Sequence, residues 1–229
     1  MATGSWLTAS VVDSAREVIA TAFDEAERRD PEHLRPWVCL VDGAKHQSDV
    51  IAAGARRRGV KVTIVCDFIH VLEYLWGAAW CFFDEGDPVA AGWVAEKGLA
   101  VLEGRAGLVA GAIARKATAL GLAGPKPKKA DECTRSFKNK RVYLDYPTAL
   151  AEGWPIATGV IERACRHLVR DRFDITGARW SLEAAEAMVK LRAVRTNGDG
   201  EAYGHHHLTA ERERVHASRY VGGVIPAAA

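Results

Sequence analysis

The sequence lacks the features that mark membrane proteins, secreted proteins and zinc ribbons. The apolar stretch 75–83 is far shorter than the ~20 residues that a membrane-spanning helix needs, and no stretch approaches that length. The first residues show no basic segment followed by an apolar core, so we expect no signal peptide. The five cysteines lie far apart without a C-x-x-C pair, which excludes a zinc ribbon and favours a reducing compartment. We therefore expect a soluble, cytoplasmic protein with no membrane partner.

A strong excess of charge of one sign is also missing. Thirty-one Lys and Arg against 29 Asp and Glu leave a formal net charge of +2, which neither favours nor excludes a nucleic-acid partner. Hydrophobic residues make up 48% of the chain and charged residues 26%, so disordered and fibrous classes are excluded. A chain of 229 residues can form one large domain.

Two short apolar runs predict a βαβ unit. The runs Trp37–Val41 and Val60–Cys66 are each followed by an aspartate, and each is typical of a strand that is buried on both faces. Residues 47–58 between them predict a helix, which Gly59 ends. Two strands joined through one helix are expected to be parallel, with a right-handed connection.

The rest of the chain is predicted to be mostly helical, so the fold class is α/β with a large helical share. A helix over 11–29 precedes the first strand, with Asp13 or Ser14 as its N-cap. Residues 121–131 are predicted to form a loop or linker because they are rich in Gly, Pro and Lys. The other helices are expected from Ile69 to a break at 84–88, and then over 89–120, 132–150, 158–172, 181–196 and 200–219.

Basic residues are concentrated between positions 105 and 141. That segment holds ten Lys and Arg against two acidic residues, a local charge of +8. Such an excess can supply contacts to phosphate, for which we consider Lys126, Lys128 and Lys129. The alternative is a solvated loop flanked by ordinary surface lysines.

Each predicted strand ends in an aspartate, Asp42 or Asp67. The carboxyl ends of parallel strands border the crevice in which sites of open α/β sheets form. Two carboxylates there could share a divalent cation through hard oxygen ligands. The alternative is an ordinary role in a turn or a helix cap.

Two further groups of residues could carry chemistry. His70 follows Asp67 by three positions at a helix start, where both side chains could bind each other or a shared ligand. Alternatively, Asp67 only caps the helix and His70 is a partly buried histidine.

Glu162, Arg166 and Arg170 recur every four residues, so the carboxylate could hold a metal while the arginines contact phosphate. Alternatively, these three residues form a solvated ion-pair ladder.

Four segments carry a resemblance to a known family: VDGAKHQ (41–47), VTIVCDFIHVLEYLWGAAWCFF (62–83), YLDYPTALAEGWPIATGVIERACRHLVRDRFDITGARW (143–180) and LRAVRTNGDGEAY (191–203). The chain resembles the ISKra-type insertion-sequence transposases of the DDE group, whose catalytic domain has an RNase H-like fold. The resemblance covers nearly all of 5–229. It implies a partial RNase H-like core that contains the βαβ unit, interrupted by a large helical insertion.

The resemblance also implies an activity. Transposases of this group use three acidic residues and two Mg²⁺ ions to cleave and join DNA ends. Asp67 and His70 match a signature that related Mutator-like enzymes carry soon after the second acid, namely Asp or Cys, two residues, and His. Asp42 is then the implied second acid and Glu162 the implied third. The implied catalytic residues are therefore Asp42, Glu162, Asp67 and His70, and the implied ligands of Mg²⁺ or Mn²⁺ are Asp42 and Glu162.

The implied partners are the DNA of the transposon ends and of the target, and a second copy of the chain is possible. The protein is then expected in the bacterial cytoplasm, associated with the nucleoid. Phosphate contacts are expected from Lys126, Lys128, Lys129, Arg166 and Arg170.

The resemblance implies four regions: a partial core (1–67), a helical insertion with the basic loop (68–150), helices that complete the core (151–200), and a C-terminal helix and tail (201–229). Two departures stand out. The family typically has Gly after the third acid, where this chain has Arg163. Before Trp37 the sequence shows no strand-like runs, so the meander that carries the first acid is not expected. We therefore expect a truncated transposase that is inactive alone. A non-catalytic DNA-binding remnant and a metal-dependent nuclease of the same fold are the alternatives.

Overall fold

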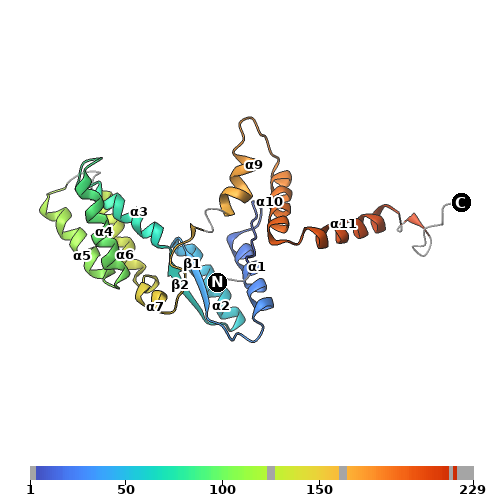
Figure 1. Ribbon diagram of the computed structural model, residues 1–229, viewed down its shortest axis with the longest axis horizontal. Coiled ribbons are helices and arrows are strands. Elements are labelled where there is room, and N and C mark those ends of the chain that lie inside the picture. The colour runs from blue at the N-terminus through green and yellow to red at the C-terminus, as the bar shows by residue number, and fades with distance from the viewer. Residues whose placement is uncertain (1–3, 123–126, 160–163, 217–218, 221–229) are drawn as a thin grey trace. The chain divides into compact units, whose positions relative to one another are not determined.

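The computed structural model describes residues 4–122, 127–159, 164–216 and 219–220 (Figure 1). The chain forms two compact units: the first combines Met1–Ala22 with Ile161–Ala229, and the second is Phe23–Val160. The described residues are mostly helical and contain one parallel sheet of two strands, which confirms the mostly helical α/β class. No helix among these residues is both long and apolar enough to cross a membrane.

The βαβ unit forms as the sequence predicts. Strand β1 (Trp37–Val41) pairs in parallel with β2 (Val62–Cys66), residue by residue along the whole length of both strands. Helix α2 (Lys45–Arg58) connects them. Gly59 ends α2 with φ = 68°, a left-handed conformation that glycine adopts without a steric penalty.

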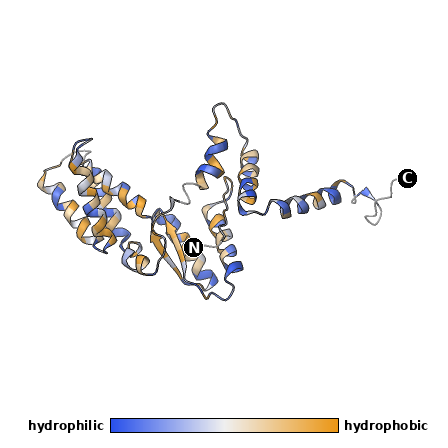
Figure 2. Ribbon diagram, in the orientation of Figure 1, coloured by the Kyte–Doolittle hydropathy of each residue, from blue (hydrophilic) through white to orange (hydrophobic). Residues whose placement is uncertain are grey.

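The strands are less buried than their unbroken apolar runs predict. Figure 2 shows both strands as hydrophobic ribbons, yet only Val41, Val65 and Cys66 are buried, and the other strand residues are half-buried. The three buried residues lie at the carboxyl ends of the strands. The sheet therefore joins the main core at its carboxyl end, the same end at which a site was expected.

A bundle of four helices follows the sheet. Helices α3 (Phe68–Ala79), α4 (Pro88–Leu102), α5 (Ala106–Ala119) and α6 (Pro127–Asn139) pack side by side (Figure 1). A 3₁₀ turn, η1 (Arg141–Tyr143), and helix α7 (Tyr146–Ala151) lead the chain away from α6.

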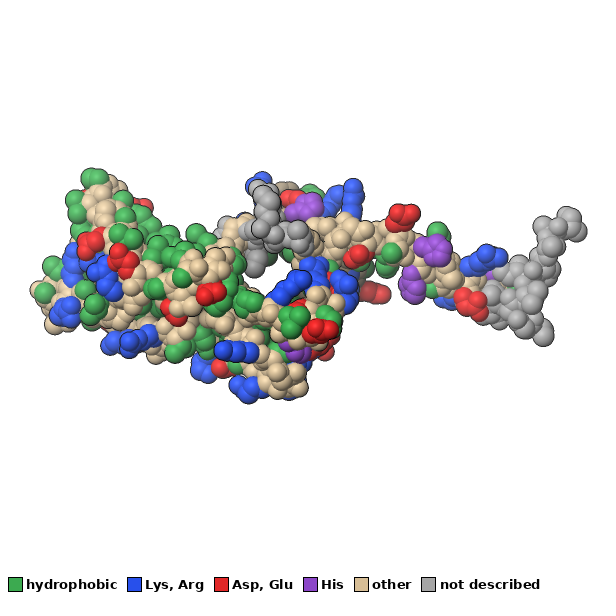
Figure 3. Space-filling model, turned by 60° about the horizontal axis from the view of Figure 1, so that its bottom comes forward, with side chains coloured by type: hydrophobic (Ala, Val, Ile, Leu, Met, Phe, Trp, Pro, Cys, Tyr) green, Lys and Arg blue, Asp and Glu red, His purple; other side chains and the backbone are tan. Residues whose placement is uncertain are grey.

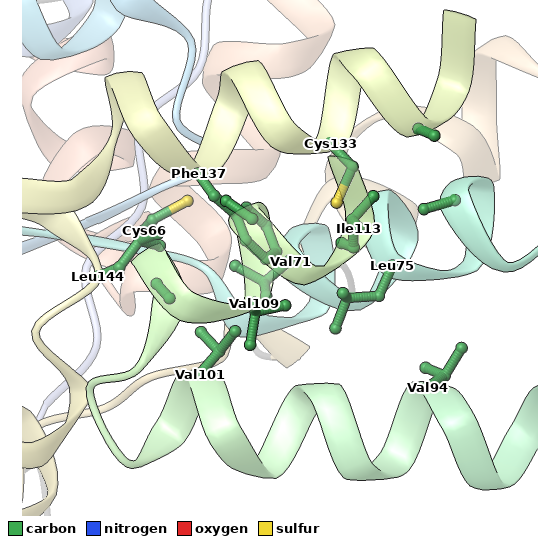
Figure 4. Packing of buried hydrophobic residues seen from close by; sticks show 14 of the residues in the cluster. Cys66, Val71, Leu75, Val94, Val101, Val109, Ile113, Cys133, Phe137 and Leu144 are labelled. Carbon is green, nitrogen blue, oxygen red and sulfur yellow. The ribbon is translucent and has the colours of Figure 1, made fainter. Parts of the chain in front are cut away.

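The core of the second unit lies between these helices. Leu75 of α3 and Ile113 of α5 are completely buried. Figure 4 shows Phe137 and Cys133 pointing from α6 into the same cluster, toward Val71 and Ile113. Burial raises the pKa of the Cys133 thiol to about 12, so this side chain stays protonated and packs as a small hydrophobic group.

Three predicted helix boundaries after residue 88 are wrong. The helix predicted over 89–120 is two helices, because Gly104 interrupts it with φ = 80°. The helix predicted to begin at 132 begins at Pro127, so Lys128 and Lys129 lie in the first turn of α6 and not in a loop. Proline suits this position because the first turn of a helix needs no N–H donor from it. The predicted helix over 132–150 is also divided, since η1 and α7 replace its second half.

Helix α1 (Ala15–Arg29) begins later than predicted, and Ser14 caps it rather than Asp13. The Ser14 hydroxyl accepts a hydrogen bond from the Glu17 backbone N–H (3.4 Å), and the Glu17 carboxylate accepts one from the Ser14 N–H (2.7 Å). This reciprocal pair is a capping box, which satisfies two backbone donors at the start of the helix.

The described residues after 163 form a π-helical turn, η2 (Arg166–Arg170), and helices α9 (Asp171–Phe173), α10 (Leu182–Asn197) and α11 (Gly200–Val215). The helices predicted over 181–196 and 200–219 correspond to α10 and α11. The described part of the helix predicted over 158–172 contains the π-helical turn instead of a regular α-helix. His205, His206 and His207 are exposed on α11, and Figure 3 shows histidine side chains at the surface of this part of the chain.

Within the first unit, Glu186 attaches the N-terminal segment to α10, and we expect this attachment to depend on pH. The Glu186 carboxylate accepts hydrogen bonds from the Ser10 hydroxyl (2.8 Å) and the Val11 N–H (2.7 Å), and pairs with Lys190 (2.7 Å). The hydrogen bond from Lys190, followed by that from Val11, lowers the pKa of Glu186 from 4.5 to about 2. The contribution to stability is therefore present above pH 4.5 and is lost as the pH falls toward 2.

NMR of the Ser10 and Val11 amides should show this transition near pH 2, and it should be absent in Glu186→Gln. A transition that persists in Glu186→Gln would show that another group controls the attachment.

Candidate active site at the carboxyl end of the sheet

A cleft of about 1060 Å³ opens at the carboxyl end of the two strands. Asp42, directly after β1, lines it together with the first turn of α2. Helix α3 contributes His70 and Tyr74, and the neighbouring α6 with η1 supplies the rest of the lining. The structure thus brings together Asp42 and His70, two of the four side chains that the resemblance marks as catalytic.

Asp42 shapes the turn between β1 and α2. Its Oδ1 accepts a hydrogen bond from the Ala44 N–H (2.8 Å), and this is the only hydrogen bond to the carboxylate among the described residues. The side chain is exposed. Asp42 therefore plays the turn role that the sequence left open, and its Oδ2 remains available to a ligand in the cleft.

Asp67 is buried beside the cleft and is not part of its lining. Its side chain is 1% exposed, and its Oδ1 caps α3 by accepting the Ile69 N–H (2.7 Å). Its Oδ2 accepts hydrogen bonds from the N–H (3.0 Å) and the hydroxyl of Thr158. Next to it, the Phe68 N–H donates to the Ile156 carbonyl (2.8 Å). Asp67 thus caps α3, as one of the two interpretations predicted, and also ties residues 156–158 to the start of this helix.

His70 pairs with Glu73 and not with Asp67. Its Nδ1 lies 2.6 Å from a carboxylate oxygen of Glu73, and its side chain is 40% exposed and lines the cleft. Sequence reasoning missed Glu73, although residues three apart on a helix are neighbours on its surface. The pair gives the cleft a histidine whose ring orientation is set by a carboxylate.

Two ion pairs lie within the cleft: Lys45 with Asp49 (2.7 Å) and Lys129 with Glu132 (3.1 Å). The contact of His70 with Glu73 (2.6 Å) lies in the same cleft. Arg135 and Lys140 also line the cleft, and neither has an acidic partner within 4 Å among the described residues. The Lys140 ammonium instead lies 4.9 Å from the centre of the Tyr74 ring.

From the sequence, Arg135 and Lys140 belong only to a local excess of positive charge. The spacing of residues in this segment indicates a shared helix face more directly. Lys129, Glu132, Ser136 and Lys140 follow one another at intervals of three or four residues, the spacing of a single helix face. All four line the cleft.

The predicted DNA-contacting residues fall in both units. Lys128 and Lys129 are exposed in the first turn of α6 in the second unit, and Lys129 is paired with Glu132. Arg166 and Arg170 are exposed at the two ends of η2 in the first unit. Lys126 lies outside the described residues. DNA binding by these side chains stays a prediction.

The predicted metal pair is described only in part, because Glu162 and its neighbour Arg163 lie outside the described residues. Within the described ranges, no group of three or more His, Cys, Asp or Glu side chains could hold a metal ion. Asp42 fits a divalent ion, since it offers a hard carboxylate oxygen to the cleft. Asp67 does not fit, because both of its oxygens are bonded within the protein.

The cysteine nearest the cleft is not a nucleophile at neutral pH. Cys66 ends β2 and is buried, which raises the pKa of its thiol to about 11, although the nearby charge of Lys140 acts in the opposite direction. Only the thiolate form of cysteine is a strong nucleophile. Cys66 is therefore expected to stay protonated beside the cleft.

Comparison of the chain with protein-family models, curated proteins and solved structures gives no match. A functional assignment thus depends on the residues of the cleft and on the sequence motifs.

Proposed function

We propose that this chain is the catalytic region of a DDE-type DNA transposase, which moves an insertion sequence by metal-dependent phosphoryl transfer. One observation carries the proposal: a cleft at the carboxyl end of a parallel βαβ unit combines a free oxygen of Asp42 with His70, Arg135 and Lys140. The motifs that resemble ISKra-type transposases support it. In this proposal the βαβ unit is part of an RNase H-like core, and the helical bundle is its insertion.

The residues of the cleft have separate roles in such a reaction. Asp42 would hold a divalent ion, and the resemblance implies Glu162 as a second ligand. A bound Mg²⁺ or Mn²⁺ would supply Lewis-acid stabilisation to the oxygens of a phosphodiester. Arg135 and Lys140 offset the negative charge of the phosphate group. His70, oriented by Glu73, accepts or donates a proton at the wall of the cleft.

Asp42→Asn tests this proposal, with Asp49→Asn as the matched control. Asp49 lines the same cleft, but its carboxylate is paired with Lys45. We expect calorimetry to detect Mn²⁺ uptake by the unaltered chain and a loss of at least about 100-fold in affinity for Asp42→Asn, because one metal ligand is removed. Asp49→Asn should bind Mn²⁺ nearly as well as the unaltered chain.

Uptake of Mn²⁺ that is equal in all three proteins would remove Asp42 from the metal site. DNA binding without any Mn²⁺ uptake by the unaltered chain would support the alternative, a non-catalytic DNA-binding remnant.

A further inference from the structure

Two cationic side chains of the cleft have no acidic partner among the described residues. The pairs Lys45–Asp49 and Lys129–Glu132 use the other two cations of the lining, which leaves Arg135 and Lys140. Each phosphodiester of DNA carries one negative charge, with which a cationic side chain can pair.

Gly43 leaves space for the Lys140 ammonium group at the carboxyl end of β1, because glycine has no side chain. A Cβ atom on Gly43 would lie 2.7 Å from the Lys140 Nζ and 2.9 Å from the Cys66 Sγ, and the φ of Gly43 is 84°. Both the space and the backbone conformation therefore require glycine at this position. The residue next to Asp42 in the sequence thus makes room for the ammonium group.

The aromatic contact of Lys140 restrains the ammonium group without neutralising it. The Tyr74 ring attracts the ammonium group through its negative face, yet it supplies no counter-ion. The first turn of α2 lines the same cleft, and among the described residues no side chain caps the N-terminus of this helix. The free N–H groups of this 14-residue helix add to the attraction for an anion in the cleft.

From this arrangement we infer that Lys140, together with Arg135, forms a phosphate-binding subsite that holds a backbone phosphodiester of DNA beside Asp42. The inference deepens the proposed function and rests on it for the identity of the ligand. The rings of Tyr74 and Tyr143, which also line the cleft, give a sugar or base an apolar surface that free phosphate would not use.

The test measures binding of a labelled DNA duplex in the presence of EDTA, so that it depends neither on metal ions nor on cleavage. Lys140→Ala is the test variant. Lys138→Ala is the matched control, because Lys138 is exposed near the end of α6, two residues before Lys140, but does not line the cleft. We expect Lys140→Ala to weaken binding about 10-fold and to lower the slope of log affinity against log salt by about one unit. Lys138→Ala should change both quantities less, and Lys140→Arg should retain most of the affinity.

Gly43→Ala provides a second variant that leaves Lys140 in the sequence but displaces its ammonium group. It should weaken duplex binding in the same direction as Lys140→Ala, in a protein whose circular dichroism shows that it is folded. Equal effects of Lys140→Ala and Lys138→Ala would overturn the inference, since general surface charge would then explain the binding.

Two results would distinguish a failure of the phosphate-binding subsite from a failure of the transposase proposal. If Asp42→Asn abolishes Mn²⁺ uptake while Lys140→Ala binds DNA normally, the subsite is wrong and the transposase proposal stands. If binding depends on Lys140 but the unaltered chain takes up no Mn²⁺, the subsite stands and the transposase proposal fails. Inorganic phosphate that competes with the duplex at an equal concentration of phosphate groups would show that the ligand is free phosphate and not DNA.

Discussion

Replacing Asp67 with alanine is expected to lower the free energy of unfolding by about 3–5 kcal/mol. The Asp67 carboxylate is 1% exposed and accepts three hydrogen bonds, from the Ile69 N–H and from the N–H and hydroxyl of Thr158. Alanine leaves these donors without their partner and also removes the N-cap of α3. Each unsatisfied buried donor costs about 1–3 kcal/mol, and loss of an N-cap costs about 1 kcal/mol.

Two milder variants separate the contributions of Asp67. Thr158→Val removes only the hydroxyl donor and should cost about 1 kcal/mol. Asp67→Asn keeps the shape of the side chain and one accepting oxygen, but its amide NH₂ then faces a donor of Ile69 or Thr158. Its cost in stability should therefore lie between those of Thr158→Val and Asp67→Ala. Urea denaturation at neutral pH measures all three. A loss below 1 kcal/mol for Asp67→Ala would show that the attachment of residues 156–158 contributes little to stability.

Features of the fold that depend on neighbouring residues in the sequence could be predicted, and features that depend on distant residues could not. The strands were predictable because β1 and β2 are short apolar runs that each end at an aspartate, and the capping role of Asp67 was predictable from its place before a helix. The bond from Thr158 to Asp67 was not, because 91 residues separate the two. No local periodicity encodes a hydrogen bond of that range. The start of α6 at Pro127 was misassigned because the composition of 121–131 outweighed the single proline signal.

The candidate site shows the same division. Asp42 was predictable because the carboxyl ends of parallel strands border a crevice. The contribution of Lys140 was not predictable, because this residue reaches the cleft through the packing of α6 against α3. Its place beside Gly43 depends on tertiary packing, and only the helical spacing from Lys129 to Lys140 hinted at a shared face. Glu162, the third implied acid, stays a prediction of the sequence alone.

Replacing Tyr146 with alanine is expected to cost about 4–5 kcal/mol of stability. Tyr146 is completely buried, and its ring meets the Phe68 ring edge-on, with 5.4 Å between the ring centres and an angle of 81°. Its hydroxyl donates a hydrogen bond of 2.8 Å to the Cys66 carbonyl. Alanine therefore removes an aromatic pair, leaves a cavity and takes the donor from a buried backbone oxygen.

The variant Tyr146→Phe isolates the hydroxyl, because it keeps the ring and leaves the Cys66 carbonyl without that donor. Burial raises the pKa of Tyr146 well above its usual value of 10, so the hydroxyl remains a donor at every pH at which the protein is handled. We expect Tyr146→Phe to cost about 1–2 kcal/mol in urea denaturation. Tyr143→Phe is the control: Tyr143 is half-buried at the cleft wall, and the loss of its hydroxyl should cost less than about 0.5 kcal/mol. The Cys66 carbonyl directly precedes Asp67, so the hydrogen bond from Tyr146 is expected to hold the end of β2 in place. Equal losses of stability for Tyr146→Phe and Tyr143→Phe would contradict this expectation. The carboxyl edge of the sheet would then be positioned by its strand pairing alone.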